Sequence, residues 1–192
     1  MKRAVLVLAA GATLAAGAGC GGETPAATGT PSSASTSVAA QSGPPSPAGS
    51  GSASAAAVPE TLKFTATTVA GDRFDGAALA GKPVVFWFWA AWCPKCRAAA
   101  DEVAAAQQAY AGRVQFVGVA GLRSGQQQMA RFVADTGVQA FPHLSDDDGV
   151  VWKRFGVTTQ EYYVMLDKTG KVVHQGAMSA DELRDRLATL AA

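Results

Sequence analysis

The pattern of apolar and polar residues predicts an α/β domain in the C-terminal part of the chain. Apolar or alternating runs predict extended segments at 62–66, 84–90, 114–120, 141–144, 162–166 and 171–175. Residues 62–66 alternate as an edge strand does, whereas 84–90 is apolar without interruption and 114–120 is apolar apart from Gln115, as buried strands are. Alternation along 84–90 places Trp87 and Trp89 on one face of that strand.

Helices are predicted between these strands, at 93–111, 124–136, 150–155 and 180–190, with a short turn at 77–79. Ser179 and Glu182 form the sequence pattern of a capping box at the start of the last helix. Strands that alternate with helices in this order predict a central sheet with helices on both faces.

The first residues predict export from the cytoplasm. Lys2 and Arg3 precede an apolar stretch at 4–16, which is too short for a membrane span and has the order of a secretory signal peptide over residues 1–20. The domain is therefore expected in a compartment where disulfides persist.

Cys20 closes this segment in a sequence that resembles a bacterial lipobox, although Gly17 stands where such motifs carry leucine. The alternative is an ordinary cleavage site among small residues. A lone cysteine at this point favours lipidation, and with it a lipid anchor in the membrane.

Residues 21–57 consist almost wholly of Gly, Ser, Thr, Pro and Ala, which predicts a disordered linker before a domain at 58–192. The formal net charge is +1, and Lys2 and Arg3 supply two of the positive charges. The remaining chain is close to neutral and has no basic block, which argues against nucleic acid as a partner.

The segment from Trp92 to Cys96 carries the clearest chemistry. Cys93 and Cys96, separated by two residues, follow a buried strand and begin a helix, where unpaired amides and the helix dipole favour a thiolate. A structural disulfide or half of a zinc site are the alternatives. The loop is too short to stabilise a fold much, and no second Cys or His pair completes a metal site. We therefore expect a redox pair that needs neither metal nor cofactor.

Residues 60–190 resemble the secreted DsbE/DsbF and TlpA/ResA group of thioredoxin-like proteins, and the actinobacterial members in particular. The segments that carry the resemblance are 86–97, 116–120, 148–157 and 164–170. The resemblance implies a thioredoxin fold, with a mixed central sheet, helices on both faces and an N-terminal strand extension. It also implies thiol:disulfide oxidoreductase activity.

The resemblance assigns roles to the residues of the motif. Cys93 would attack or be attacked in a mixed disulfide, and the less accessible Cys96 would resolve it. Pro94 suits the first helical position, and Lys95 would favour the thiolate and so a more oxidising pair. Trp92 would offer an apolar surface for docking substrate proteins.

The sequence departs from the family pattern at three positions. The family has a cis-proline before the strand at 162–166, and here the dipeptide is Gln160–Glu161; Ala99 and Asp101 replace a Glu and a Pro of the first helix. Glu161 either points into solvent on a modified loop, which we favour, or brings its carboxylate towards the sulfurs and opposes thiolate formation.

Other polar residues are expected to be structural. His143 and His174 are expected at the surface or with satisfied hydrogen bonds, and the acidic run Asp146–Asp148 in a solvated turn. Trp152 is expected in the core.

These observations predict a monomeric extracytoplasmic oxidoreductase, secreted or lipid-anchored, that acts as an oxidase on exported cysteine-containing proteins and is recycled by a membrane redox partner. A reductant in cytochrome c maturation and a redox-silent thioredoxin-like binding lipoprotein are the alternatives.

Overall fold

The structure is a computed structural model that describes residues 57–192. The predicted signal peptide, the lipidation candidate Cys20 and the linker up to residue 56 lie outside the described residues. No helix within 57–192 is both long and apolar enough to cross a membrane.

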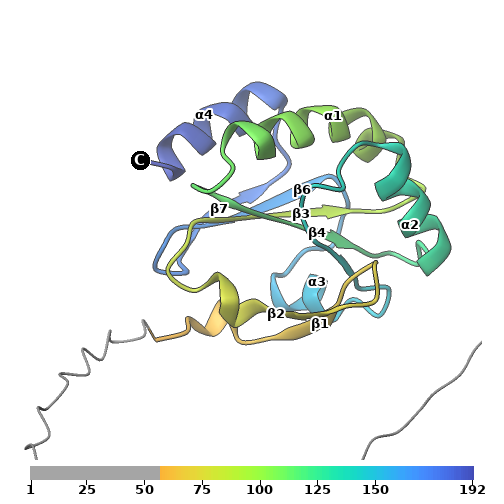
Figure 1. The fold of residues 1–192 in the computed structure, drawn as a ribbon, viewed down its shortest axis with the longest axis horizontal. Helices are drawn as coiled ribbons and strands as arrows, with labels where there is room; N and C mark the ends of the chain where they lie inside the picture. Colours follow the sequence, from red (N-terminus) through yellow and green to blue (C-terminus); the bar gives the residue numbers. More distant parts are fainter. Residues whose placement is uncertain (1–56) are drawn as a thin grey trace, which may run out of the picture. The chain divides into compact units, whose positions relative to one another are not determined.

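A mixed sheet of five strands forms the centre of the domain, in the order β5-β4-β3-β6-β7 (Figure 1). Its strands are β3 (Val84–Trp89), β4 (Gln115–Ala120), β5 (His143–Ser145), β6 (Tyr162–Leu166) and β7 (Val172–Gly176). Strands β3, β4 and β5 are parallel to each other, whereas β6 is antiparallel to β3 and to β7.

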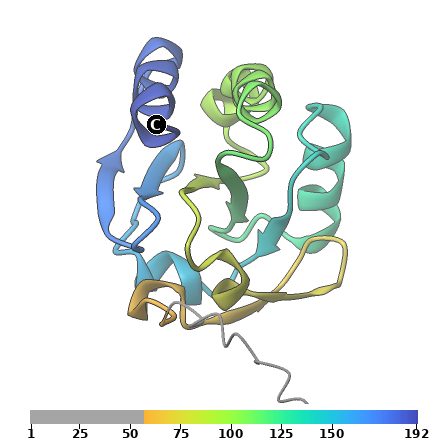
Figure 2. The same cartoon turned by 60° about the vertical axis from the view of Figure 1, so that its left-hand side comes forward.

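Helices cover both faces of this sheet, as expected. Helices α1 (Pro94–Ala109), α2 (Gln126–Asp135) and α4 (Ala180–Leu190) lie on one face (Figures 1 and 2). The other face is covered by α3 (Val150–Arg154), by a hairpin of β1 (Thr65–Thr67) and β2 (Arg73–Asp75), and by the 3₁₀ turns η1 (Glu60–Leu62) and η2 (Gly76–Leu79).

Strand β3 is the centre of the core, because all six of its residues are fully buried. Trp87 and Trp89 pack with α1, α2 and α4, while Phe86 and Phe88 pack with α3 and the 3₁₀ turns. The predicted alternation is thus confirmed. The elements packed on the two sides of the sheet bury both faces of β3, and β4 and β6 cover its two edges.

The predicted elements agree with the structure except at the N-terminal extension. The strand expected at 62–66 is wrong in its first part, because Leu62 belongs to η1 and β1 begins at Thr65. Strand β2 was not predicted, because Phe74 is its only apolar residue and its pairing with β1 defines it. The capping box that opens α4 is confirmed by hydrogen bonds in both directions.

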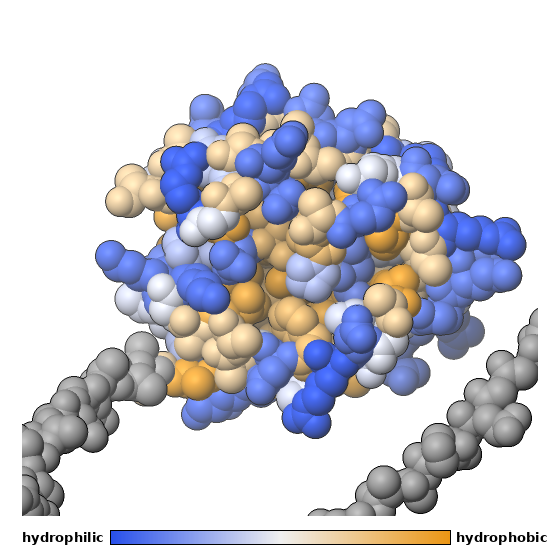
Figure 3. All heavy atoms as spheres, viewed as in Figure 1, coloured by the Kyte–Doolittle hydropathy of each residue, from blue (hydrophilic) through white to orange (hydrophobic). Residues whose placement is uncertain are grey.

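Figure 3 shows one face of the molecule, on which hydrophilic residues surround a central apolar area. The large apolar side chains that stay exposed within the described residues are Trp92, Val150, Val172 and Val173. Trp152 is buried, as expected.

His143 is a buried residue with both ring nitrogens in use. Its Nδ1 accepts from Trp89 Nε1 at 3.2 Å, so Nε2 carries the proton and donates to the Val138 carbonyl at 2.8 Å. The ring lies over Gly118 of the neighbouring strand, where a Cβ would collide with it. Burial lowers the pKa of His143 from 6.5 to about 4.

This pKa predicts an acid-dependent loss of stability. As the pH falls from 6.5 to about 4, the unfolded chain protonates His143 and the folded chain does not. The free energy of unfolding therefore falls by roughly 3 kcal/mol as the pH falls through this window. Above pH 6.5 the full stability is present. Urea denaturation at about pH 7 and about pH 4.5 measures the loss. In His143→Asn, which keeps an acceptor for Trp89, the loss should be smaller by that amount; an equal loss in both proteins would contradict the assignment.

Candidate active site

The Cys93–Cys96 pair lies where β3 ends and α1 begins, and it is oxidised to a disulfide. Cys93 is the N-cap of α1, and Pro94 occupies the first helical turn. The Cys96 amide points at Cys93 Sγ at 3.1 Å. An amide aimed at this sulfur, together with the positive end of the helix dipole, would stabilise a thiolate on Cys93 once the disulfide opens.

Local chemistry explains why the chain turns at this point. Proline lacks the N–H that would be unpaired in the first turn, and its φ suits a helix start. The Cys93 amide donates to the Ala90 carbonyl at 3.1 Å, and the Cys93 carbonyl accepts from Arg97 at 3.2 Å. The buried strand therefore passes into the helix through a tight, hydrogen-bonded turn.

Both sulfurs are shielded in the oxidised protein. Cys93 is 3% exposed and Cys96 is fully buried. The order of exposure agrees with an attacked Cys93 and a resolving Cys96, but Cys93 is less open than its place at the helix end led us to expect. Both cysteines belong to the cluster that Trp87 and Trp89 form with α1, α2 and α4.

Trp92 is the exposed aromatic residue beside the disulfide, with 56% of its surface open. Its indole N–H donates to the Leu122 carbonyl at 3.0 Å, which fixes the direction of the ring. Leu122 and Arg123 have φ values of 58° and 56°, in the left-handed region that non-glycine residues seldom adopt. A strained loop therefore lies next to Trp92 and is tied to it.

The same loop is held from two further sides. The Ser124 hydroxyl accepts from the Ala91 amide at 2.8 Å and donates to the Gly121 carbonyl at 2.6 Å. The Asp147 carboxylate accepts from the amides of Ser124 and Gly125, each at 2.8 Å, at the start of α2. These bonds connect the loop to the residue that precedes Trp92.

The expectation of a solvated turn at Asp146–Asp148 is wrong for Asp146, whereas Asp147 and Asp148 are exposed and lie in a turn, as expected. Asp146 is buried and accepts from the amides of Val150 and Trp152 at 2.9 and 2.8 Å, so it caps α3. Asp147 caps α2 from a distance in sequence. Asp146 and Asp147 thus bind the starts of two different helices. The contact of Asp147 with the start of α2 cannot be read from the local sequence.

Glu161 is half-buried on the disulfide side of the sheet, which makes the expected solvent-facing side chain wrong. Its Oε1 accepts from Tyr163 Oη at 2.7 Å, and its Oε2 accepts from Trp87 Nε1 at 3.2 Å. Burial raises the pKa of Glu161, although both hydrogen bonds and the charge of Lys95 act to lower it. Trp87 and Tyr163 are site residues that the sequence analysis did not identify.

The register of the sheet places Glu161 at this end. Strand β6 is antiparallel to β3 and its first residue, Tyr162, pairs with Phe88, so Glu161 lies beside the end of β3 that leads to Cys93. Its φ is 55°. Proline requires a φ near −65°, so this backbone excludes the residue that the family pattern carries here. Gln160, which precedes it, is half-buried.

The remaining charged groups differ in their relation to the site. Lys95 is exposed on the first turn of α1, and its charge acts on Glu161. The guanidinium of Arg97, also exposed, lies 5.2 Å from the centre of the Phe132 ring. His174 lies on β7. Burial and the positive charge of Arg186 lower its pKa, and the negative charge of Glu182 acts in the opposite direction.

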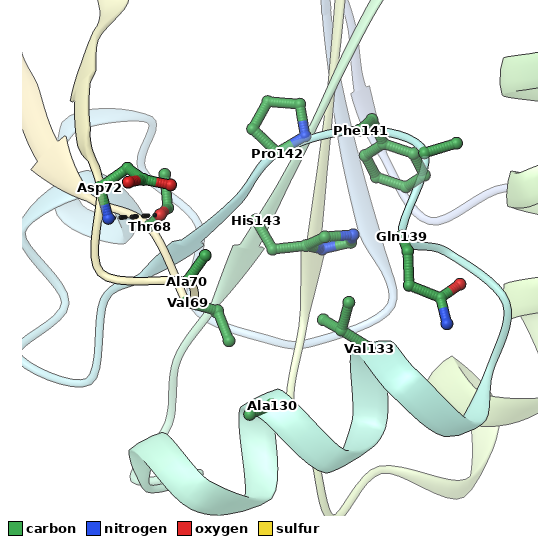
Figure 4. Close-up of a pocket in the computed structure, with 11 residues that line it drawn as sticks. Thr68, Val69, Ala70, Asp72, Ala130, Val133, Gln139, Phe141, Pro142 and His143 are labelled. Atoms are coloured by element: carbon green, nitrogen blue, oxygen red, sulfur yellow. Dashed lines mark hydrogen bonds between the residues drawn. The ribbon is translucent and has the colours of Figure 1, made fainter. Parts of the chain in front are cut away.

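A separate pocket lies between α2 and the turn that joins β1 to β2. Figure 4 shows Ala130 and Val133 of α2 on one side of it and His143 on its wall. None of the cysteines, Trp92 or Glu161 lines this pocket. Within residues 57–192 no cluster of metal-ligating side chains is found.

Two proteins are similar to this chain in sequence. The chain is 45% identical over 141 residues to the soluble secreted antigen MPT53 of Mycobacterium tuberculosis, covering 70% of this chain and 78% of that protein. The thiol:disulfide interchange protein DsbE of Yersinia pestis is 28% identical over 118 residues, covering 61% of this chain and 59% of that protein.

Solved structures give the same result. The dsbF protein of MTB, solved in mixed oxidized and reduced forms, is 45% identical with a TM-score of 0.65, covering 69% of this chain and 98% of that chain. A secreted M. tuberculosis disulfide oxidoreductase homologous to E. coli DsbE is 42% identical with a TM-score of 0.62, covering 68% and 98%. A thioredoxin family protein of Chlorobium tepidum, 24% identical with a TM-score of 0.60 and covering 67% and 93%, shares the fold.

The sequence pattern of the AhpC/TSA family matches residues 57–175. This match spans more than half of the chain and includes the disulfide and the whole of β6. Together with the mixed sheet and the structures that share it, it shows that the chain belongs to the AhpC/TSA family and has the thioredoxin-like fold.

Proposed function

We propose that this chain is an extracytoplasmic thiol:disulfide oxidoreductase that forms disulfides in exported proteins. The observation that carries the proposal is the Cys93–Cys96 disulfide at the N-terminus of α1, in a fold that is shared with a secreted disulfide oxidoreductase at 42% identity. The pair itself holds the two electrons of the reaction, so the chemistry requires no further group.

The exchange proceeds in two displacements. A substrate thiolate attacks Cys93 Sγ, a substrate–Cys93 disulfide forms, and the Cys93–Cys96 bond breaks with its electron pair on Cys96. A second thiolate of the substrate then attacks the substrate sulfur of the mixed disulfide, and Cys93 leaves as a thiolate. The substrate has lost two electrons and the cysteine pair has gained them. A membrane redox partner returns the pair to the disulfide.

The oxidase direction rests on what stabilises the reduced pair. The helix N-terminus favours a Cys93 thiolate, and so does the cation of Lys95. Ala99, at a position where the family has a glutamate, removes one carboxylate from α1. A stabilised thiolate stabilises the reduced protein, which makes the disulfide a stronger oxidant.

Export and tethering follow from the N-terminal sequence. The segment 1–20 would direct secretion, lipidated Cys20 would anchor the protein, and the linker up to residue 57 would let a monomeric domain reach substrates near the membrane. The secreted relative MPT53 supports an extracytoplasmic location.

Removing each sulfur should have a different effect. Cys93→Ser should lower the rate at which the protein oxidises a reduced, unfolded test protein by at least about 100-fold, because no Cys93–Cys96 disulfide is left for a substrate thiolate to attack. Cys96→Ser should keep a reactive Cys93 and trap mixed disulfides. Refolding assays and non-reducing electrophoresis measure both. Equal activity of Cys93→Ser and the unmodified protein would contradict the proposed function.

Trp92 should matter for protein substrates and not for small thiols. Trp92→Ala removes the exposed ring and its bond to Leu122, so KM for an unfolded protein substrate should rise about tenfold, as for loss of an aromatic contact at an interface. The rate with dithiothreitol should stay within about twofold. Val150→Ala is the matched control, because Val150 is 65% exposed on α3, on the other face of the sheet. An equal effect of both substitutions would contradict a docking role.

The reduction potential decides the direction of exchange. For an oxidase we expect a value nearer to that of DsbA, about −120 mV, than to that of thioredoxin, about −270 mV. Equilibration with glutathione buffers, followed by thiol counting, measures it. A value near thioredoxin's would support the reductant alternative, and a pair that does not exchange at all would support a redox-silent binding protein.

A further inference from the structure

The buried carboxylate of Glu161 has no role in the exchange described so far. Within residues 57–192 its hydrogen bonds come from Tyr163 and Trp87, and both of these residues pack in the cluster that contains Cys93 and Cys96. The sheet register puts it at the end of β3 that leads to the disulfide. A carboxyl group kept half-buried at such a place, on a backbone with a φ of 55°, requires an explanation in terms of what it does.

The exchange itself calls for a proton donor and acceptor near Cys96. Cys96 is fully buried, and a thiolate that leaves into an apolar surrounding is unstable unless it takes up a proton. In the opposite direction, the Cys96 thiol must lose its proton before it can attack a mixed disulfide at Cys93. The backbone amide of Cys96 points at the Cys93 sulfur, so it does not stabilise a thiolate on Cys96 itself.

Three other titratable side chains of the described residues, His143, Asp146 and Asp147, are engaged in hydrogen bonds elsewhere. His143 uses both ring nitrogens and has its pKa lowered to about 4, so it is a poor base at neutral pH. Asp146 and Asp147 are bound by amides at the starts of α3 and α2. Residue 99, one turn after Cys96 on α1, is an alanine.

We propose that Glu161 is the group that exchanges a proton with Cys96 during disulfide exchange. The inference rests on the proposed function. When a substrate thiolate attacks Cys93, the Cys93–Cys96 bond breaks, Cys96 takes the electron pair, and the carboxylic acid of Glu161 gives its proton to Cys96. In the reverse step the Glu161 carboxylate takes the proton of the Cys96 thiol, Cys96 attacks Cys93 Sγ, and the substrate leaves as a thiolate. The proton passes directly or through one water molecule.

The groups around the carboxyl keep it usable in both forms. Burial raises the pKa of Glu161, which brings the acid form closer to neutral pH. Tyr163 on β6 and Trp87 on β3 donate to the carboxylate, and Lys95 on α1 is the cation that acts on it. Tyr163 itself stays protonated, because burial and the charge of Glu161 raise its pKa.

The test isolates the step that involves Cys96. Reduced protein is mixed rapidly with oxidised glutathione, and the Cys93–glutathione disulfide is followed by acid quenching and mass spectrometry. In Glu161→Gln the first attack by Cys93 should stay within about threefold. Release of glutathione by Cys96 should slow about 10- to 100-fold, so that the mixed disulfide accumulates. The release rate of the unmodified protein should rise with pH through the pKa of Glu161, and Glu161→Gln should lack this rise.

Two measurements exclude a merely structural effect. Glutamine can accept from Trp87 and donate to Tyr163, and it removes a buried acid whose raised pKa makes its charged form unfavourable to folding as the pH rises. Glu161→Gln should therefore unfold at the same or a higher temperature at about pH 7. Tyr163→Phe removes a hydrogen bond that lowers the pKa of Glu161, so the rise in release rate should move to higher pH while its plateau stays within about threefold.

Each outcome decides between the claims. If neither the unmodified protein nor Cys96→Ser, which lacks the releasing sulfur, forms a mixed disulfide at Cys93, the proposed function and this inference both fail. If it does, and Glu161→Gln releases glutathione at the normal rate with an unchanged pH profile, the inference alone is overturned. Slow release in Glu161→Gln, with the shifted profile in Tyr163→Phe, supports it.

Discussion

The burial of two indole groups on one face of β3 is the constraint on which the rest of the site depends. Trp87 and Trp89 are fully buried, and a buried indole N–H without an acceptor costs free energy; both of these N–H groups have an acceptor within the protein. The acceptors are Glu161 and His143, from the two sides of the strand. The strand that delivers Cys93 to its place therefore also fixes two titratable side chains, which the sheet brings in from distant parts of the chain.

Local patterns in the sequence were enough to predict the frame of the fold. The alternation in β3 gave the faces of Trp87 and Trp89, the capping box gave the start of α4, and Pro94 gave the start of α1. Each of these features depends on residues that are only a few positions apart in the sequence. For that reason a single segment of sequence contains the whole signal.

The contacts around the disulfide could not be predicted in the same way. Trp87 and Glu161 are 74 residues apart, and their hydrogen bond depends on the register of β3 and β6. Asp147 binds the start of α2, 23 residues earlier in the chain, because the fold brings the two segments together. Strand β2 has one apolar residue and exists through its pairing with β1. For Glu161 and Asp147 the deciding partner is remote in sequence; for β2 the partner is near, but a single apolar residue leaves no alternation to detect.

The φ of Glu161 has a consequence for how this site can change over generations. The ring of a proline at this position could not adopt the present φ. Replacing Glu161 by the family's proline alone would therefore strain the loop or force it into another conformation. The same change would remove the acceptor of the buried Trp87 N–H. Side chain and loop path are thus an epistatic pair, and lineages that carry the glutamate should keep it together with a tyrosine at 163.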